Sequence, residues 1–325
     1  MLNNAAIYKE KLCQICSKQT LFQVKNQCID YISNEKFNLL KCNSCGCYFT
    51  EPPLNKKNTD YYGEEYYNKK TGKFSPLVEY FFKFNHRKNA RKIYSRFNAV
   101  KILEVGCGRG YLLNEVSKLG ADVYCLESSD AADWILENSQ VKMFTDTNDK
   151  NWLFSESFFQ LVILWHVFEH LLNPTETLKF LRRNIVTGGY LVISVPNVSS
   201  WQAKLGLKTW FHLDVPRHQI HFDKKSLIYL LKQNKFEIIT ITSGDFIQNL
   251  FGWFQSLANL FTSKRINSLY RLLQGGNPML NIDKKSLFIQ IITSVFWIPV
   301  GILGYIFEEF SGNHGTITII ARKMK

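Results

Sequence analysis

Residues 100–110 read Val-Lys-Ile-Leu-Glu-Val-Gly-Cys-Gly-Arg-Gly, a short apolar run that leads directly into three closely spaced glycines. The apolar spacing over 111–119 predicts an amphipathic helix, and a second apolar strand over 122–126 ends at Glu127. Strand, glycine-rich turn, helix, strand and acidic residue, in this order, make half of a doubly wound sheet. We therefore predict an α/β fold.

The glycine spacing and two acidic residues indicate the kind of cofactor. The spacing is GxGxG, whereas dinucleotide sites use GxGxxG at a helix N-terminus that faces a pyrophosphate. Glu104 precedes the glycines, where it would repel a pyrophosphate but suit the sulfonium and ammonium groups of S-adenosylmethionine (SAM). Glu127 lies 21 residues after Gly106, where a carboxylate can accept ribose hydroxyls. The alternative is a tight turn with two solvated acids. The residues predicted to bind SAM are Glu104, Gly106, Cys107, Gly108, Gly110 and Glu127.

Four segments, in order, resemble the motifs of class I SAM-dependent methyltransferases. They are ILEVGCGRGYLL (102–113), ADVYCLESS (121–129), FFQLVILWHVFEHLLNP (158–174) and LRRNIVTGGYLVISVPN (181–197). The resemblance covers roughly residues 75–243 and the last strand. It implies a doubly wound seven-stranded sheet, mostly parallel, with an antiparallel last strand. One departure is Gln160, where the family usually has Asp.

The first 47 residues hold six of the eight cysteines. Cys13-Gln-Ile-Cys16 and Cys42-Asn-Ser-Cys45 are two CxxC turns, and two such turns that meet make a closed tetrahedral zinc site. No apolar signal segment opens the chain, so we expect a reducing, cytoplasmic setting in which paired cysteines bind metal. The alternatives are redox dithiols or unconnected thiols. Cys28 and Cys47 are extra, and Cys47 competes with Cys45 as a ligand. The zinc-ribbon-like module would be structural.

Histidines gather where the reaction is expected. Two follow the fourth strand (His166 and His170), and three lie in the loop after the fifth: His212, His218 and His221. Open α/β sheets bind ligands at the carboxyl ends of their strands, and histidine is suited to accept a proton near neutral pH. We take His166, His170 and His218 as the catalytic candidates. For each, the alternative is that it only braces the fold.

A metal-assisted variant stays open. The residues around His170 are similar to the metal-binding arrangement of ubiquinone-pathway and small-RNA 2′-O-methyltransferases. In this hypothesis Glu169, His170 and His218 hold a second divalent cation that orients two substrate hydroxyls. His166 replaces a carboxylate of those families, and this loss of negative charge weakens binding of a hard cation.

A long apolar insertion separates the predicted sixth strand (236–241) from the last strand (316–322). Residues 246–263 carry no charge and have one apolar helical face. Residues 287–307 are 21 uncharged residues, a length that spans a bilayer as one helix. A single crossing would separate the last strand from its sheet. We therefore expect peripheral docking on the cytoplasmic membrane face, or else a buried helical pair over the active site or a dimer interface.

The chain carries a net charge of +13, with a pI of about 9.3, which suits acidic partners or a lysine-rich surface. No basic block or Arg-Gly repeat indicates nucleic acid as a partner. Tyrosines in the linker (Tyr61, Tyr62, Tyr66, Tyr67) and Tyr80 would line the substrate entrance or dock the domains together. The predicted regions are a zinc-binding module (1–60), a linker and leading helix (61–98), a SAM-binding core (99–243), a hydrophobic helical insertion (244–314) and the last strand (315–325).

The CxxC module and the later VPRHQIHF resemble a subgroup associated with sugar and cell-surface glycan methylation. We therefore expect methyl transfer from SAM to a hydroxyl of a sugar or of a lipid-linked glycan intermediate. The rivals are a metal-assisted O-methyltransferase acting on a catechol-like lipid or an RNA end, and a membrane-docked, non-catalytic scaffold. The sequence does not indicate an oligomeric state.

Overall fold

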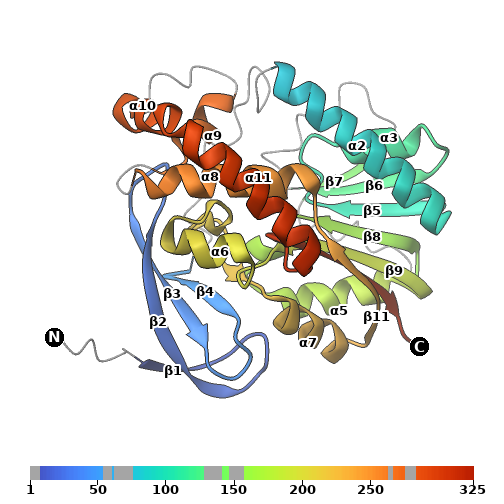
Figure 1. Ribbon diagram of the computed structural model, residues 1–325. Coiled ribbons are helices and arrows are strands. Elements are labelled where there is room, and N and C mark those ends of the chain that lie inside the picture. The colour runs from blue at the N-terminus through green and yellow to red at the C-terminus, as the bar shows by residue number, and fades with distance from the viewer. Residues whose placement is uncertain are drawn as a thin grey trace.

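The computed structural model describes residues 8–53, 61, 76–127, 141–145, 157–262, 266–274 and 283–325. These residues form two sheets flanked by helices (Figure 1). The larger sheet confirms the predicted α/β fold. Its strands are β5 (Lys101–Val105), β6 (Asp122–Glu127), β7 (Lys142–Thr145), β8 (Phe159–Trp165), β9 (Ile185–Pro196), β11 (Phe236–Ser243) and β12 (Thr316–Lys323).

The strand order in the larger sheet is β11-β12-β9-β8-β5-β6-β7. The strands from β9 to β7 pair in parallel, and β12 lies antiparallel between β9 and β11. The sheet is thus mostly parallel with an antiparallel last strand, as predicted. Its reversal point lies between β5 and β8, so ligands are expected at the carboxyl ends of these two strands.

Helices cover both faces of this sheet. On one face α2 (Pro76–Phe97) and α3 (Tyr111–Ser117) bury Ile93 and Leu113 against Ile102 of β5. On the other face α5 (Pro174–Asn184) and α7 (Lys224–Gln233) pack on Leu103 and its neighbours. Successive residues of a strand point to opposite faces, so an unbroken apolar strand such as β5 serves both cores.

The smaller sheet is antiparallel, in the order β1-β2-β3-β4-β10. Four of its strands come from the N-terminal region: β1 (Tyr8–Leu12), β2 (Gln19–Ile29), β3 (Lys36–Cys42) and β4 (Tyr48–Glu51). The fifth, β10 (Ile220–His221), belongs to the loop between β9 and α7, and it pairs with Phe49 and Tyr48. The cysteine module and the histidine-rich loop therefore share one sheet.

The insertion before β12 is helical. It contains α8 (Phe246–Leu260), α9 (Ser268–Leu273), α10 (Lys284–Ile292) and α11 (Ser294–Ser311), and it packs beside α6 (Trp201–Gly206), which follows β9. Asp245 caps α8, since its carboxylate accepts hydrogen bonds from the backbone N–H groups of Ile247 and Gln248.

The uncharged run 287–307 does not form one continuous helix. The chain breaks at Thr293, and α10 and α11 meet at a bend of 66°. The Thr293 hydroxyl donates to the Ile289 carbonyl at 2.7 Å, and the Trp297 indole donates to the Gln290 carbonyl at 2.8 Å. Two carbonyl groups at the end of α10 thus accept hydrogen bonds from side chains. Among the described residues no single helix is long and apolar enough to cross a membrane, although this bent pair passes by length and composition.

Two of the linker tyrosines fall within the described residues. The Tyr61 hydroxyl donates to Glu35, and its ring packs edge-on against Phe37, so this tyrosine contacts the N-terminal module. Tyr80 is exposed on α2. The other three, Tyr62, Tyr66 and Tyr67, lie outside the described residues.

Candidate active site

A cavity of about 570 Å³ lies where β5 ends and the glycine-rich turn begins. Its lining comes from six separate parts of the chain: α2, the glycine turn, the end of β8, the loop after α6, helix α8 and helix α9. The lining includes Glu79, Phe81, Asn85, Glu104, Gly106, Cys107, Gly108, Tyr111, Trp165, His166, Phe211, Asp245, Ile247, Gln248, Phe251 and Tyr270.

The glycines serve backbone geometry and close approach. Gly106 has a φ of +70°, and a Cβ at this position would lie 2.3 Å from Val167 Cγ2, so no larger residue fits. Gly108 has a φ of +53°, yet a Cβ there would meet no atom within 4 Å. The turn therefore holds the backbone against Val167 and leaves open space on the cavity side at Gly108.

Glu104 is the buried acid of this cavity. It is 4% exposed, and its Oε2 has no hydrogen-bond partner among the described residues. Burial raises the pKa of Glu104 well above its ordinary value, and nearby Glu127 raises it further. A ligand that brings a cation would satisfy this carboxylate. The residues present thus fit SAM, whose ammonium and sulfonium groups are positive.

Glu127 ends β6 beside the same turn. Its Oε2 accepts a hydrogen bond of 2.8 Å from the Gly108 N–H. It is not among the residues that line the cavity, and residues 128–140, which follow it, lie outside the described part of the chain. The predicted contact with ribose hydroxyls stays a prediction.

A disulfide joins Cys107 of the turn to Cys125 of β6. In the parallel pair β5–β6, Cys125 lies opposite Glu104, close to the point where β5 ends and the glycine turn begins. The sequence reasoning missed this pairing, because it treated Cys107 only as a cofactor contact. The bond fastens the glycine turn to the neighbouring strand.

Helix α2 contributes more to the cavity than its sequence indicated. The Tyr111 hydroxyl donates to Glu79 at 2.5 Å, and Asn85 donates to Asp245 at 2.5 Å. These bonds tie α2 to the first turn of α3 and to the cap of α8. The sequence analysis assigned no site role to this helix, although Asn85, a polar residue at the same helical spacing as Val78 and Phe81, is a signal that could have indicated this face.

His166 lies on the cavity wall directly after β8, in a left-handed conformation with a φ of +55°. Its Nδ1 lies 3.5 Å from Glu169 Oε1, and its Nε2 has no hydrogen-bond partner among the described residues. Glu169 is 1% exposed, and neither of its oxygens has a hydrogen-bond partner there either. The pair has the arrangement of a histidine that a buried carboxylate orients.

His170 and His218 lie behind Glu169 and do not line the cavity. Their rings are 4.6 Å apart, and His218 Nε2 lies 3.8 Å from Glu169 Oε1. His170 Nδ1 donates to the Arg217 carbonyl at 3.0 Å, and His218 Nδ1 donates to the His212 carbonyl at 2.9 Å. The three predicted catalytic histidines are therefore neighbours around one carboxylate, but only His166 reaches the cavity.

The other two histidines of the loop are held by the fold. His212 contacts the Gln248 carbonyl through Nε2, and burial lowers its pKa to about 3. His221 contacts the Thr50 hydroxyl through Nε2 at 3.0 Å, and burial lowers its pKa to about 3 as well. Both are neutral in the folded protein near pH 7.

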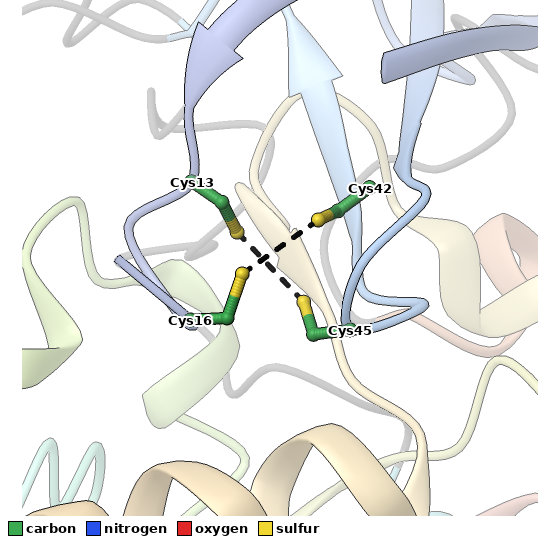
Figure 2. A group of neighbouring side chains, drawn as sticks. All are labelled: Cys13, Cys16, Cys42 and Cys45. Atoms are coloured by element: carbon green, nitrogen blue, oxygen red, sulfur yellow. Dashed lines mark hydrogen bonds between the residues drawn. The ribbon is translucent and has the colours of Figure 1, made fainter. Parts of the chain in front are cut away.

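The four predicted cysteine ligands converge. Figure 2 shows their side chains pointing to one centre from two turns. Cys13 and Cys45 Sγ atoms are 3.8 Å apart, and those of Cys16 and Cys42 are 3.9 Å apart. Thiolates of a tetrahedral zinc site, with bonds of about 2.3 Å, are about 3.8 Å from each other. The cluster thus fits structural zinc, with Cys45 rather than Cys47 as the fourth member.

This module holds the histidine loop through several buried contacts. The Thr50 hydroxyl donates to the His218 carbonyl at 2.6 Å. Arg217, fully buried, pairs at 2.6 Å with both Asp30 of the module and Asp214 of the loop, and lies over the Tyr31 ring. The residues on either side of His218 are therefore fixed by the N-terminal module.

Comparison with known proteins agrees with this geometry. A family model described as a methyltransferase domain matches residues 65–241, more than half of the chain. No curated protein matches the chain. Solved structures that resemble it include a SAM-dependent methyltransferase from Archaeoglobus fulgidus (16% identity, TM-score 0.45, 74% of this chain and 94% of that one).

Two more structures illustrate the range. A SAM-dependent methyltransferase from Methanosarcina mazei is 17% identical, with a TM-score of 0.41, over 69% of this chain and 92% of that one. The [4+2]-cyclase SpnF is 15% identical, with a TM-score of 0.46, over 73% and 80%. At such scores these structures carry no argument about the reaction. The family match does: the chain belongs to the methyltransferase domain family and is a SAM-dependent methyltransferase.

Proposed function

We propose that this protein transfers the methyl group of SAM to a hydroxyl of a sugar or of a lipid-linked glycan intermediate. The observation that carries the proposal is His166, which lies on the wall of the cofactor cavity and is backed by the buried carboxylate of Glu169. Bound SAM would supply an electrophilic methyl on its sulfonium. What the chain must then supply is a place for the acceptor and a base for its proton.

His166 supplies the base. With its proton on Nδ1, 3.5 Å from Glu169 Oε1, the ring keeps the Nε2 lone pair for the acceptor hydroxyl. As the new oxygen–methyl bond forms and the methyl–sulfur bond breaks, the hydroxyl proton passes to Nε2. The carboxylate then stabilises the imidazolium, because burial of Glu169 limits screening of its charge by solvent.

The cavity wall supports an acceptor with an apolar face. Phe81, Phe211, Phe251, Tyr270 and Trp165 surround a few polar groups. Pockets of this kind hold an organic ligand by apolar contact and orient it by those few polar groups. A sugar ring carried on a lipid matches both requirements.

Titration calorimetry with SAM tests the cofactor half of the proposal. We expect one saturable site, and Glu104→Gln should weaken binding at least roughly tenfold, because it removes a buried charge partner. Glu115→Gln, on the outer surface of α3, is the matched control and should bind as the wild type does. Equal affinity of the Glu104 variant, or tight binding of a nicotinamide dinucleotide instead, would contradict the proposal.

The acceptor half is tested by mass spectrometry of surface glycans and lipids from cells with the wild type, with His166→Asn and without the protein. We expect a mass increase of one methylene unit that depends on the protein. The His166 variant should keep SAM affinity and lose roughly 10² to 10⁴ in turnover, the usual contribution of a positioned base. Normal turnover in this variant would remove His166 from the mechanism.

A metal-assisted reaction on a catechol-like lipid or RNA end is the second candidate, and one observation favours it. His170 and His218 donate through Nδ1 to carbonyls, so each neutral ring presents an unprotonated Nε2. Their ligand atoms and a Glu169 oxygen lie within 4.8 Å of one another. Three acceptors facing one another suit a divalent cation, and the two carbonyls would fix the ring orientation.

Manganese titration of zinc-loaded protein separates the two candidates. If the metal-assisted reaction holds, Mn²⁺ binds saturably, Glu169→Gln and His218→Ala abolish binding, and turnover requires the metal. If the metal-free reaction holds, added Mn²⁺ changes neither SAM binding nor turnover, and His218→Ala keeps most of its activity.

A further inference from the structure

Helices α10 and α11 expose an apolar surface that is unusual in its width. On α11 the exposed side chains include Val295, Leu303 and Phe310, which are 67, 66 and 88% exposed. The others on this surface are Phe296, Ile298, Val300, Ile302, Ile306 and Phe307, and on α10 Phe288, Ile291 and Ile292. At about 100° per residue, the exposed positions from 295 to 307 cover roughly 200° of the helix circumference.

The remaining side of α11 is fixed to the protein. Gly301 and Gly304 pack so closely on α8 that a Cβ would lie 2.6 Å from Phe254 and 2.8 Å from Trp253. Glu308, fully buried, accepts hydrogen bonds from Gln202 of α6 and from the Gly315 N–H. Gln290 of α10 is likewise buried and donates to Thr262. These contacts keep both helices on the molecule, so they cannot leave it to cross a bilayer.

The shape and chemistry of the exposed side favour lipid over a protein partner. No charged residue occurs from Ser286 to Phe307. A rigid partner would have to wrap more than half of a helix, but lipid chains conform to any contour. Lys284 and Lys285, both exposed, stand at the start of the apolar run, and the whole chain carries +13. Such cations at the border of an apolar surface complement anionic headgroups.

We propose that α10 and α11 lie in the interface of an anionic bilayer, with the apolar side in the outer part of the acyl region. The helices would lie along the membrane surface rather than through it. In Figure 1 α10 and the start of α2 lie at the top of the molecule, and α11 runs from there down across the front; Tyr80, Phe81 and Phe84 of α2 are also exposed.

The membrane would then lie close to the cavity. Phe254 and Leu257 of α8 pack on α11, and Ile247, Gln248 and Phe251, nearer the start of the same helix, line the cavity. Helix α8 thus contacts both the cofactor cavity and the helix that carries the exposed apolar surface. Delivery of a lipid-linked acceptor by this route rests on the proposed function, whereas the docking itself does not.

Vesicle flotation with the full-length, zinc-loaded protein tests the docking. The probes are vesicles of phosphatidylcholine with 30% phosphatidylglycerol, and vesicles of phosphatidylcholine alone. The wild type should float with the anionic vesicles. Val295→Glu with Leu303→Glu should lower the partition coefficient at least tenfold, because both charges enter the apolar side. Leu12→Glu with Leu21→Glu, two exposed positions on the N-terminal sheet, is the matched control and should change it less than twofold.

Replacement of Lys284 or Lys285 by Ala should each lower binding to anionic vesicles roughly fivefold and leave binding to neutral vesicles unchanged. SAM calorimetry on every variant should match the wild type, so a failure of docking and a failure of the cofactor site are told apart. The proposal is overturned if the wild type stays unbound, or if the control pair loses as much binding. It is equally overturned if sedimentation shows that the wild type is a dimer and that the Val295/Leu303 variant is a monomer.

Discussion

The N-terminal module and the helical insertion both pack on the same α/β core, and they do so by different means. The module joins the core by strand pairing, since β4 and β10 share a sheet, and by the ion pairs of Arg217 with Asp30 and Asp214. The insertion joins through buried uncharged amides and one carboxylate. These are Gln202, Asn249, Asn259 and Glu308, whereas Gln255 and Gln290 form hydrogen bonds within the insertion.

This difference separates two roles. The module contacts the loop that holds His218 and His221, so it positions the groups around Glu169. The insertion lines the cavity through α8, while the outer side of α10 and α11 faces away from the protein. The insertion therefore positions the part of the cavity wall that would contact the acceptor. Damage to the module should therefore disturb the histidines, and damage to the outer side of the insertion should leave them intact.

Zinc removal should have the largest effect. In small zinc-dependent folds the metal supplies roughly 10 kcal/mol or more of apparent binding free energy, so Cys16→Ala or chelation should unfold the module. We expect hydrogen exchange to show loss of amide protection over 214–223, while α8 and β5 keep theirs. Elemental analysis should give one zinc per wild-type chain.

The control for this experiment is Cys28→Ala, since Cys28 is buried in the same module but lies outside the four-sulfur cluster. It should keep its zinc and the protection of the loop. If chelated protein kept the loop fully protected, the module would be an attachment without a positioning role.

Loss of Arg217 should come next. Arg217→Met leaves the Asp30 carboxylate buried without its partner, and removal of one member of a buried pair costs about 3–5 kcal/mol. Urea unfolding should show this loss. Asp30→Asn added to Arg217→Met should restore part of it, because the stranded charge is gone while the side chain still accepts the turn N–H of Ser33. Simple additivity of the two changes would show that the ion pair does not link module and loop.

Much of this fold was predictable, because local pattern and tertiary structure agree in the core. The glycine turn, the buried strands and Glu104 stand where the sequence indicated, since an apolar run before closely spaced glycines has few other stable conformations. The CxxC spacing likewise sufficed to bring four sulfurs together, because each pair shares one turn.

The rest depends on contacts between distant segments, which no local pattern encodes. The pairing of β4 with β10 joins residues more than 160 positions apart, and the disulfide between Cys107 and Cys125 needs the register of β5 on β6. The break at Thr293 arises because the side chains of Trp297 and Thr293 donate hydrogen bonds to carbonyl groups of α10. That His170 and His218 lie behind Glu169 rather than in the cavity follows from the course of a loop that the module fixes.

Acidification should weaken the module's attachment through His221. Its folded pKa of about 3 lies below the ordinary value of 6.5, so the unfolded chain binds the proton first as the pH falls. The stabilisation that neutral His221 contributes is complete above pH 6.5 and is lost as the pH falls towards 3. At pH 5 the loss is about 2 kcal/mol. Between pH 7 and pH 5, the free energy of unfolding of His221→Asn should fall by less than that of the wild type, as measured by urea unfolding at saturating zinc. An equal loss in both proteins would assign the acid sensitivity to another group.

The insertion should respond to pH in the opposite direction, by a smaller amount. Burial raises the pKa of Glu308 to about 6 from 4.5, and the hydrogen bonds from Gln202 and Gly315 limit the rise. A raised carboxyl pKa gives stabilisation that is complete below pH 4.5 and is lost as the pH rises through 6. Glu308→Gln should therefore gain about 1 kcal/mol over the wild type at pH 7.5 and nothing at pH 5. This is less than the roughly 2 kcal/mol that the shift represents, because an amide has one acceptor oxygen. If the variant were less stable at both pH values, the charged carboxylate would be holding α11 on α6. The insertion would then be attached to the core by a charged group, as the N-terminal module is.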